Sequence, residues 1–264
     1  MSDRLAITAL AGAKTIRLEA FQLTKAQAER LKKAFGGTAS VQKQLRAVSE
    51  AVTAPIRVRD RLVVVGSESA RKAEKKQAGS RPVLLIPAGM AFGTGDHATT
   101  ATCLRFLADV SDELADTKWE MLDLGAGSGI LALAARLLGA RKAEAGDFDP
   151  HAVRTAKENA RLNDIQAITI KKLDVRDWKP TRTWKVVAAN LFSDLLMEVA
   201  PKIVAAVAPG GRLVFSGILR TQETEVIAAF RKAGLQIHRL VRKGKWVSGL
   251  ATRPEGGILT GKTR

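Results

Sequence analysis

From Pro82 onward, short runs rich in Val, Ile, Leu and Ala alternate with longer stretches in which apolar residues recur every three or four positions. The short runs predict buried strands, and the longer period predicts amphipathic helices. The expected strands are Val83–Ile86, Glu120–Leu124, Ala143–Asp147, Ala167–Leu173, Val186–Asn190 and Arg212–Ser216. The expected helices are Ala98–Leu107, Gly129–Leu138, Pro150–Asn163, Ser193–Val207 and Thr221–Ala233. Such alternation predicts an α/β fold, in which helices cover both faces of a mostly parallel, Rossmann-like sheet.

The end of the pattern differs from the rest. Gln236–Val241 and Lys245–Leu250 are two strand-like runs joined by the short basic turn Arg242–Gly244. Two strands with so short a connection form an antiparallel hairpin. We therefore expect the sheet to close with an antiparallel strand.

The first 66 residues have a separate pattern, which predicts a small α+β domain. Ile16–Phe21 predicts a strand, Thr24–Phe35 a helix that ends at a glycine pair, Val41–Val48 an extended stretch, and Ile56–Val65 a strand or hairpin. Residues 67–81 are polar and nearly free of large apolar side chains, which predicts a basic linker. The expected division is thus 1–66, 67–81 and 82–264.

The net charge bears on possible partners, because 43 Lys and Arg against 26 Asp and Glu give a formal net charge of +17. A balance this basic favours an anionic partner such as RNA. The basic residues are dispersed, however, so a solvated basic surface is an equally good interpretation.

Other counts exclude several classes. Cys103 is the only cysteine, which excludes an internal disulfide and a cysteine-based zinc cluster, and its apolar helical surroundings predict a core position. We expect no metal site. No apolar run approaches a membrane span and the N-terminus lacks a signal pattern, so we expect no membrane contact and a cytoplasmic protein.

Leu122–Gly129 contains a glycine-rich turn, Gly-Ala-Gly-Ser-Gly, that follows an expected strand and opens an expected helix. In that setting glycines let a ligand approach the main chain closely, so Gly125 and Gly127 are candidate cofactor-binding residues. The turn lacks the Gly-x-x-Gly ending of the dinucleotide fingerprint, so it need not be shaped for a pyrophosphate.

Three aspartates after the glycine-rich turn are candidates for cofactor binding or for local structure. Asp147 ends the next strand, where a carboxylate can accept hydrogen bonds from both hydroxyls of a ribose. Asp149 precedes Pro150 and predicts a helix N-cap. Asp174, after the following strand, is placed either to meet an adenine amino group or to serve as a surface turn residue.

Several segments together resemble the PrmA-type methyltransferases, which modify a lysine-bearing protein of the large ribosomal subunit. The most specific is Ala-Phe-Gly-Thr-Gly-Asp-His-Ala-Thr-Thr at 91–100, and the likeness extends through Leu122–Ala140, Gly146–Asn163, Ala189–Leu191 and Ser216–Leu219. The resemblance implies a seven-stranded class I methyltransferase sheet, S-adenosylmethionine as cofactor, and a ribosomal protein as the substrate that the N-terminal domain recognises.

The resemblance also implies roles for individual residues. Thr100, Gly125, Asp147 and Asn190 occupy cofactor-contacting positions, and the loop with Phe92 and Thr94 would lie over the sulfonium and the incoming amine. The carbonyl oxygen of the Asn190 side chain could accept a hydrogen bond from that amine. We therefore take Asn190, Phe92 and Thr94 as candidate catalytic residues. His97 could help to deprotonate the amine, although local packing at a helix start is the simpler interpretation.

Three readings of the function remain open at this point. The first is a protein-lysine methyltransferase acting on a ribosomal protein, or on another protein. The second is an RNA methyltransferase, which is disfavoured because such enzymes usually carry Asn/Asp-Pro-Pro-aromatic where this chain has Asn-Leu-Phe-Ser at 190–193. The third is a non-enzymatic assembly factor that binds S-adenosylmethionine.

Overall fold

The computed structural model describes residues 54–77, 79, 81–87 and 97–256, together with 5–9, 16–20, 29, 30, 32–34 and 36. Contacts between residues divide the chain into two units, Met1–Ser49 and Glu50–Arg264. This division lies before the boundary expected at residue 66.

The N-terminal unit contains a two-stranded antiparallel sheet. Strands β1 (Leu5–Ala9) and β2 (Ile16–Ala20) pair with Ile7 opposite Leu18. The second strand confirms the prediction at Ile16–Phe21, whereas β1 has no counterpart among the expected elements. The helix expected at Thr24–Phe35 is helical at residues 29, 30 and 32–34, and its remainder and the stretch Val41–Val48 lie outside the described residues.

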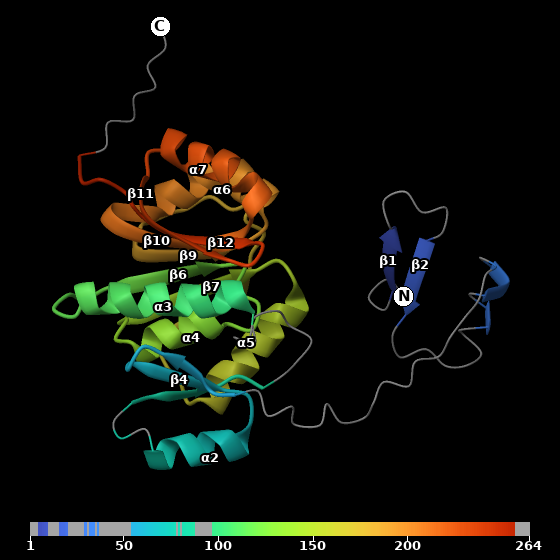
Figure 1. The fold of residues 1–264 in the computed structure, drawn as a ribbon, viewed down its shortest axis with the longest axis horizontal. Coiled ribbons are helices and arrows are strands. Elements are labelled where there is room, and N and C mark those ends of the chain that lie inside the picture. Colours follow the sequence, from blue (N-terminus) through green and yellow to red (C-terminus); the bar gives the residue numbers. More distant parts are fainter. Residues whose placement is uncertain are drawn as a thin grey trace, which may run out of the picture. The chain divides into compact units, whose positions relative to one another are not determined.

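The second unit is built on a seven-stranded sheet with the strand order β11-β12-β10-β9-β6-β7-β8 (Figure 1). Its strands are β6 (Glu120–Leu124), β7 (Lys142–Asp147), β8 (Ile168–Lys172), β9 (Trp184–Asn190), β10 (Val207–Leu219), β11 (Gln236–Lys243) and β12 (Trp246–Thr252). Strands β6 to β10 pair in parallel, and β12 is antiparallel to both β10 and β11. The predicted fold class and its closing hairpin are confirmed.

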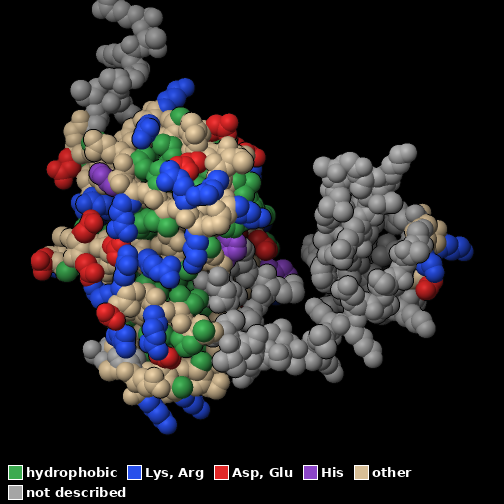
Figure 2. Space-filling view, viewed as in Figure 1, with side chains coloured by type: hydrophobic (Ala, Val, Ile, Leu, Met, Phe, Trp, Pro, Cys, Tyr) green, Lys and Arg blue, Asp and Glu red, His purple; other side chains and the backbone are tan. Residues whose placement is uncertain are grey.

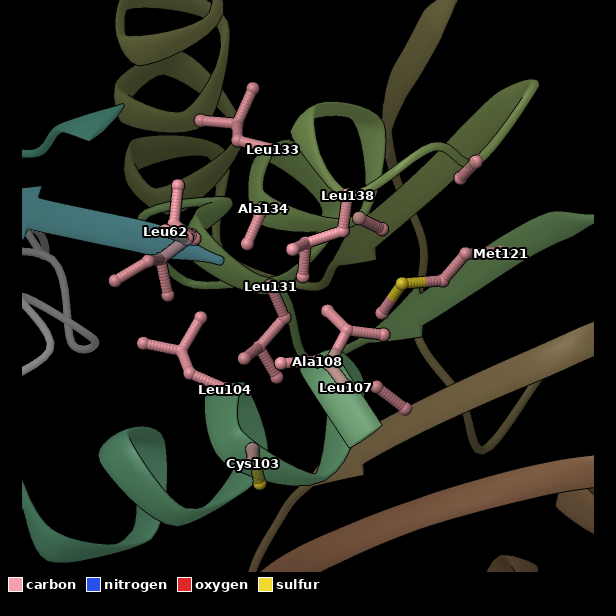
Figure 3. Close-up of a cluster of buried hydrophobic side chains, with 14 of the residues drawn as sticks. Leu62, Cys103, Leu104, Leu107, Ala108, Met121, Leu131, Leu133, Ala134 and Leu138 are labelled. Carbon is pink, nitrogen blue, oxygen red and sulfur yellow. The ribbon is translucent and has the colours of Figure 1, made fainter. Parts of the chain in front are cut away.

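Helices cover both faces of this sheet. Helices α3 (Ala98–Glu113), α4 (Ile130–Leu137) and α5 (Pro150–Leu162) contribute to one hydrophobic core, while α6 (Ser193–Ala206) and α7 (Glu223–Lys232) contribute to the other. A short 3₁₀ turn, η2 (Arg220–Gln222), precedes α7. Strand residues alternate between these cores, since Met121 lies in the first and Leu122 in the second. Figure 3 shows the first core, where Leu104 of α3, Met121 of β6 and Leu131 of α4 gather.

A smaller sheet extends the first core. Strands β3 (Ile56–Val58) and β4 (Leu62–Val65) form an antiparallel hairpin, and β4 pairs in parallel with β5 (Val83–Leu85). Leu62 of this sheet packs into the same core as α3 and α4 (Figure 3). The expected hairpin at Ile56–Val65 is thus present, but it belongs to the second unit. Strand β5, expected in the large sheet, belongs to this smaller one.

The segment expected as a linker contains helix α2 (Glu68–Gln77), which connects β4 to β5. The Ser67 hydroxyl accepts a hydrogen bond from the Ala70 amide at 3.2 Å and caps the helix start. The side of α2 that faces the sheet includes Glu74, which is buried and pairs with Arg57 at 3.0 Å. Because α2 contacts the sheet partly through this paired carboxylate, its sequence shows almost no apolar periodicity. For that reason the sequence pattern predicts a linker there.

No helix within the described ranges is long and apolar enough to cross a membrane.

Candidate cofactor and substrate site

The strand order fixes where a ligand can bind. Strands β6 and β9 are neighbours, yet the chain leaves β6 toward β7 on one side and leaves β9 toward β10 on the other. In open α/β sheets such a reversal opens a crevice at the carboxyl ends of the strands, where ligands bind. Leu124, Asp147 and Asn190 are the last residues of β6, β7 and β9, so the expected site residues lie at this edge.

The glycine-rich turn has the backbone that its sequence predicts. Gly125, Gly127 and Gly129 have φ angles of +73°, +55° and +79°, which residues other than glycine rarely adopt. The amides of Gly125 and Ala126 both donate to the carbonyl oxygen of Gly146, at 2.9 and 3.1 Å. These bonds join the end of β6 to the end of β7, and Gly129 then begins α4 as its N-cap residue.

Asp147 is bonded directly to the turn. Its side chain is 9% exposed, Oδ2 accepts the Gly127 amide at 2.8 Å, and Oδ1 accepts the Asp149 amide at 3.0 Å. A carboxylate has about four lone-pair sites, so each oxygen keeps capacity for one more donor. The structure thus holds Asp147 in a fixed orientation, with a lone pair left on each oxygen for a further donor.

The other two aspartates serve local structure. Asp149 is the N-cap of α5 and accepts the His151 amide at 2.8 Å, with Pro150 in the first turn, which confirms that prediction. Asp174 is exposed, and its Oδ1 accepts the Arg176 amide at 2.9 Å within a turn. This contact fits the interpretation as a turn residue, and the adenine contact of Asp174 stays a prediction.

Leu191 brings the end of β9 against the glycine-rich turn. A Cβ atom at Gly125 would lie 2.3 Å from Leu191 Cδ2, and one at Gly217 would lie 2.2 Å from the Leu191 carbonyl oxygen. Neither position has space for a side chain. Glycine at both places therefore lets the loop after Asn190 lie between β6 and β10.

A chain of hydrogen bonds orients Asn190. Its Nδ2 donates to the Thr99 hydroxyl at 3.4 Å, and that oxygen lies 2.7 Å from Nδ1 of His97. His97 Nδ1 also accepts the Thr99 amide at 3.4 Å and is the N-cap of α3. With the amide nitrogen of Asn190 engaged in this way, its oxygen is the atom left to accept a hydrogen from a substrate. Trp246 of β12 meets the His97 ring edge-on at 5.1 Å between centroids.

Two buried polar atoms of this region have no hydrogen-bond partner among the residues that the structure describes. The Thr100 hydroxyl in the first turn of α3 is one, and Oδ1 of Asp123 is the other. Asp123 lies under the glycine-rich turn, where Oδ2 accepts the Ala132 amide at 3.2 Å. Burial raises the pKa of Asp123 to about 7. Unpaired buried polar atoms are costly, which makes both atoms candidates for contact with a polar ligand.

Cys103 is part of the core, as predicted. Its side chain is fully buried, and burial raises the pKa of the thiol to about 12. A thiol that stays protonated at neutral pH is a poor nucleophile. This excludes it as a reactive group in the folded protein.

The loop with Phe92 and Thr94 lies outside the described residues, so their roles stay predictions. Two other aromatic side chains lie beside the site, Phe148 after Asp147 and Phe192 after Leu191, and they are 68% and 77% exposed. Within the described ranges, no three His, Cys, Asp or Glu side chains gather as metal ligands would.

The structure brings most of the predicted site residues to one edge of the sheet. Gly127 donates to Asp147, and Gly125 donates to the residue before it, Gly146. Asn190 and Thr100 belong to β9 and α3, which pack beside them. Sequence reasoning missed Thr99 and Asp123. A polar residue in the middle of the apolar run at β6 was the available signal for Asp123, since a buried carboxylate needs a reason to be there.

A family model described as ribosomal protein L11 methyltransferase (PrmA) matches residues 1–254. A ribosomal protein L11 methyltransferase from Chloroflexus aurantiacus is 39% identical over 225 residues, which is 76% of this chain and 66% of that protein. The corresponding protein of Chromohalobacter salexigens is 42% identical over 194 residues, 74% of this chain and 62% of that protein.

A solved structure gives the same result. The ribosomal protein L11 methylase from Lactobacillus delbrueckii subsp. bulgaricus has a TM-score of 0.63 and 26% identity, and the likeness covers 76% of this chain and 98% of that one. The matched part of this chain spans less than two thirds of the two curated relatives. The match over residues 1–254 nevertheless confirms the resemblance, and the chain belongs to the ribosomal protein L11 methyltransferase (PrmA) family.

Proposed function

We propose that this protein is an S-adenosylmethionine-dependent N-methyltransferase that methylates amino groups of ribosomal protein L11. Membership of the family supports the proposal, and so do the curated relatives, whose names describe that activity. The observation that carries it is the direct bond from the Gly127 amide to the Asp147 carboxylate, beside the oriented Asn190.

The residues of the site fit S-adenosylmethionine. The Asp147 carboxylate has free acceptor positions for the two ribose hydroxyls, and Gly125 and Gly127 allow close approach to the main chain. The unpaired Thr100 hydroxyl and Asp123 oxygen offer a donor and an acceptor for the polar amino-acid end of the cofactor. Asp174 would meet the adenine amino group.

When bound, S-adenosylmethionine would supply an electrophilic methyl group on its sulfonium for in-line transfer to an unprotonated amine. This displacement needs alignment and exclusion of water more than an acid–base pair. The Asn190 side-chain oxygen would orient the amine by accepting one of its hydrogens, because Thr99 holds the amide nitrogen. Phe92 and Thr94 would close over the reacting groups and keep water out.

The cellular setting follows from the substrate. A protein that modifies a ribosomal protein would work in the cytoplasm, and the excess of basic residues supports contact with ribosomal RNA. RNA is the less favoured acceptor of the methyl group, because Asn-Leu-Phe-Ser at 190–193 lacks the two prolines that are typical of nucleic-acid amine methylation.

Transfer of labelled methyl groups tests the proposal. The protein would be incubated with methyl-labelled S-adenosylmethionine and ribosomes that carry unmethylated L11, and protein and RNA would then be separated. We expect the label in the protein fraction. Label confined to RNA would contradict the proposed substrate, and cofactor binding with no label in either fraction would favour the assembly-factor reading.

A further inference from the structure

The surfaces of helices α5 and α2 carry a strip of exposed cations, which we call the basic ridge. It consists of six residues: Arg154, Lys157 and Arg161 on α5, and Lys72, Lys75 and Lys76 on α2. The spacings along α5 are three and four residues, and those along α2 are three and one. Side chains three and four apart lie on one face of a helix, so each helix presents its cations together.

The two helices form one continuous surface. Arg71 of α2 donates from Nη1 to the carbonyl oxygen of Leu162 at 3.0 Å, and Leu162 is the last residue of α5. The next residue, Asn163, exchanges hydrogen bonds of 2.8 Å with both the amide and the carbonyl of Leu85 in β5. Strand β5 lies in the sheet that α2 covers. These contacts fix the end of α5 beside α2 and the small sheet.

The ridge differs from the paired arginines across α3. Across α3, Asp109 accepts bonds from Arg59 and Arg239 at 2.9 Å, and Arg212 pairs with Glu113 at 3.0 Å. Figure 2 shows blue and red side chains interleaved on that face. By contrast, no carboxylate among the described residues lies within ion-pair distance of any of the six ridge cations.

The carboxylates near the ridge do not neutralise it. Glu68 pairs with Arg71 at 2.9 Å, while Glu158 and Asp164 are exposed on and beside α5 and form no ion pair with a ridge residue. Cations that are not engaged in ion pairs favour an external anion, and the six ridge cations outnumber these two exposed carboxylates. The ridge therefore fits a polyanion.

The dimensions indicate a long partner. Helix α5 has 13 residues and α2 has 10. At the usual rise per residue these lengths are about 20 and 15 Å, enough to follow several phosphates of a nucleic-acid backbone. Helix α5 begins directly after Asp147 and Asp149, so the ridge starts at the edge of the cofactor site and runs away from it.

We propose that the basic ridge binds the sugar–phosphate backbone of RNA. Lysine ammonium groups on flexible stems suit phosphate contacts that carry no sequence information. A bilayer surface fits less well, because Leu162 is the only exposed large apolar side chain that the structure describes on either helix. The choice of RNA among polyanions rests on the proposed action on a ribosomal protein.

Binding of the full chain to a fluorescently labelled ribosomal RNA fragment tests the proposal, with affinity measured against salt concentration. One variant combines Arg154→Gln, Lys157→Gln and Arg161→Gln, and a second combines Lys72→Gln, Lys75→Gln and Lys76→Gln. Each triple should weaken binding by at least about tenfold near 0.1 M salt and lower the salt slope by about two to three. The matched control replaces three exposed lysines elsewhere that form no ion pair with any described residue, Lys118→Gln, Lys179→Gln and Lys232→Gln.

Two further measurements separate the outcomes. Affinity for S-adenosylmethionine, measured by calorimetry, should be unchanged in all three variants, which shows that they are folded and keeps this test apart from the proposed function. Equal weakening by the control triple, or an unchanged salt slope in both ridge triples, would overturn the proposal. So would ridge-dependent binding to vesicles of anionic lipid without binding to RNA.

Discussion

At the scale of single residues, the site depends on a few carboxylates and hydroxyls whose partners the fold fixes. Asp147 orients the glycine-rich turn and keeps free acceptor positions, while Thr99 orients Asn190. Asp123 lies beneath the turn, and one of its oxygens has no partner in the described part of the chain. These three side chains do different work, so their substitution should give different results.

Asp147→Asn should weaken cofactor binding by at least about tenfold, because hydrogen bonds to a charged group contribute about 1.5–3 kcal/mol each. Titration calorimetry with S-adenosylmethionine measures this directly. Asp149→Asn is the matched control, since Asp149 caps α5 in the same loop and should leave the affinity nearly unchanged. Equal affinities for the wild type and Asp147→Asn would rule out the ribose role.

Thr99→Val should lower kcat severalfold with little change in cofactor affinity. Valine keeps the shape of threonine but removes the oxygen that accepts from Asn190, so the amide would lose its fixed orientation. Thr99→Ser keeps the hydroxyl and should restore most of the rate. A change in KM alone, or no rescue by serine, would argue against a positioning role.

Asp123→Asn should change how stability depends on pH. Because the pKa of Asp123 in the folded protein is raised to about 7, the folded state holds this proton between about pH 4 and 7 while the unfolded chain has lost it. Stability of the wild type should therefore fall as pH rises through that range and level off above it. The full shift corresponds to on the order of 4 kcal/mol.

Urea unfolding of wild type and Asp123→Asn at several pH values measures the difference. The difference between the free energies of unfolding of the two proteins should change between about pH 4 and 7, because asparagine has no proton to lose there. Parallel curves from pH 4 to 8 would show that the carboxyl does not titrate as its burial implies.

At the scale of elements, glycines set how closely the loops of the site approach each other. Gly217 has a φ of +87°, and a Cβ there would overlap the Leu191 carbonyl oxygen. Gly234 has a φ of +101° with nothing within 4 Å of such an atom. An alanine would strain the backbone at both positions, but only at Gly217 would its Cβ atom overlap a neighbour.

Gly217→Ala should therefore destabilise the protein more than Gly234→Ala. We expect strain of about 1–3 kcal/mol at either position, and a further loss at Gly217 because the loop after Asn190 must shift. Thermal unfolding gives the stabilities, and the methylation rate should fall only for Gly217→Ala. Equal loss in both variants would mean that the close approach to Leu191 is not needed.

The elements also show how far the sequence alone leads. Strong patterns predict β6 to β9 and α4 to α7 within a few residues, and the Asp149-Pro150 pair predicts the start of α5. Helix α2 is missed because its contact with the sheet includes a carboxylate paired with arginine, which no apolar period reveals. Strand β5 is predicted but assigned to the wrong sheet, because a short apolar run does not specify its partner strand.

For the site, too, only the residues with a recognisable local sequence pattern could be predicted. Gly125, Gly127 and Asp147 could be predicted because each has a local sequence setting that is typical of its role. Thr99 could not, since its effect on Asn190 comes from a contact between residues 91 positions apart. Long-range hydrogen bonds between side chains leave no pattern along the chain.

At the scale of the whole molecule, the second unit contains both the seven-stranded sheet and the smaller sheet with α2. The shared core of Leu62, Leu104 and Leu131 joins the smaller sheet to α3 and α4 (Figure 3). Because α2 is docked through that smaller sheet, the basic ridge is a fixed feature of the unit that carries the cofactor site. Six exposed cations are thus held in fixed positions on that unit.

The most direct test of the account is methylation of purified ribosomal protein L11 with S-adenosylmethionine, followed by intact-mass spectrometry. The wild-type protein should add whole methyl increments to L11, and Asn190→Ala should bind the cofactor but add them far more slowly. Absence of any mass increment with wild-type protein that binds the cofactor would contradict the central claim.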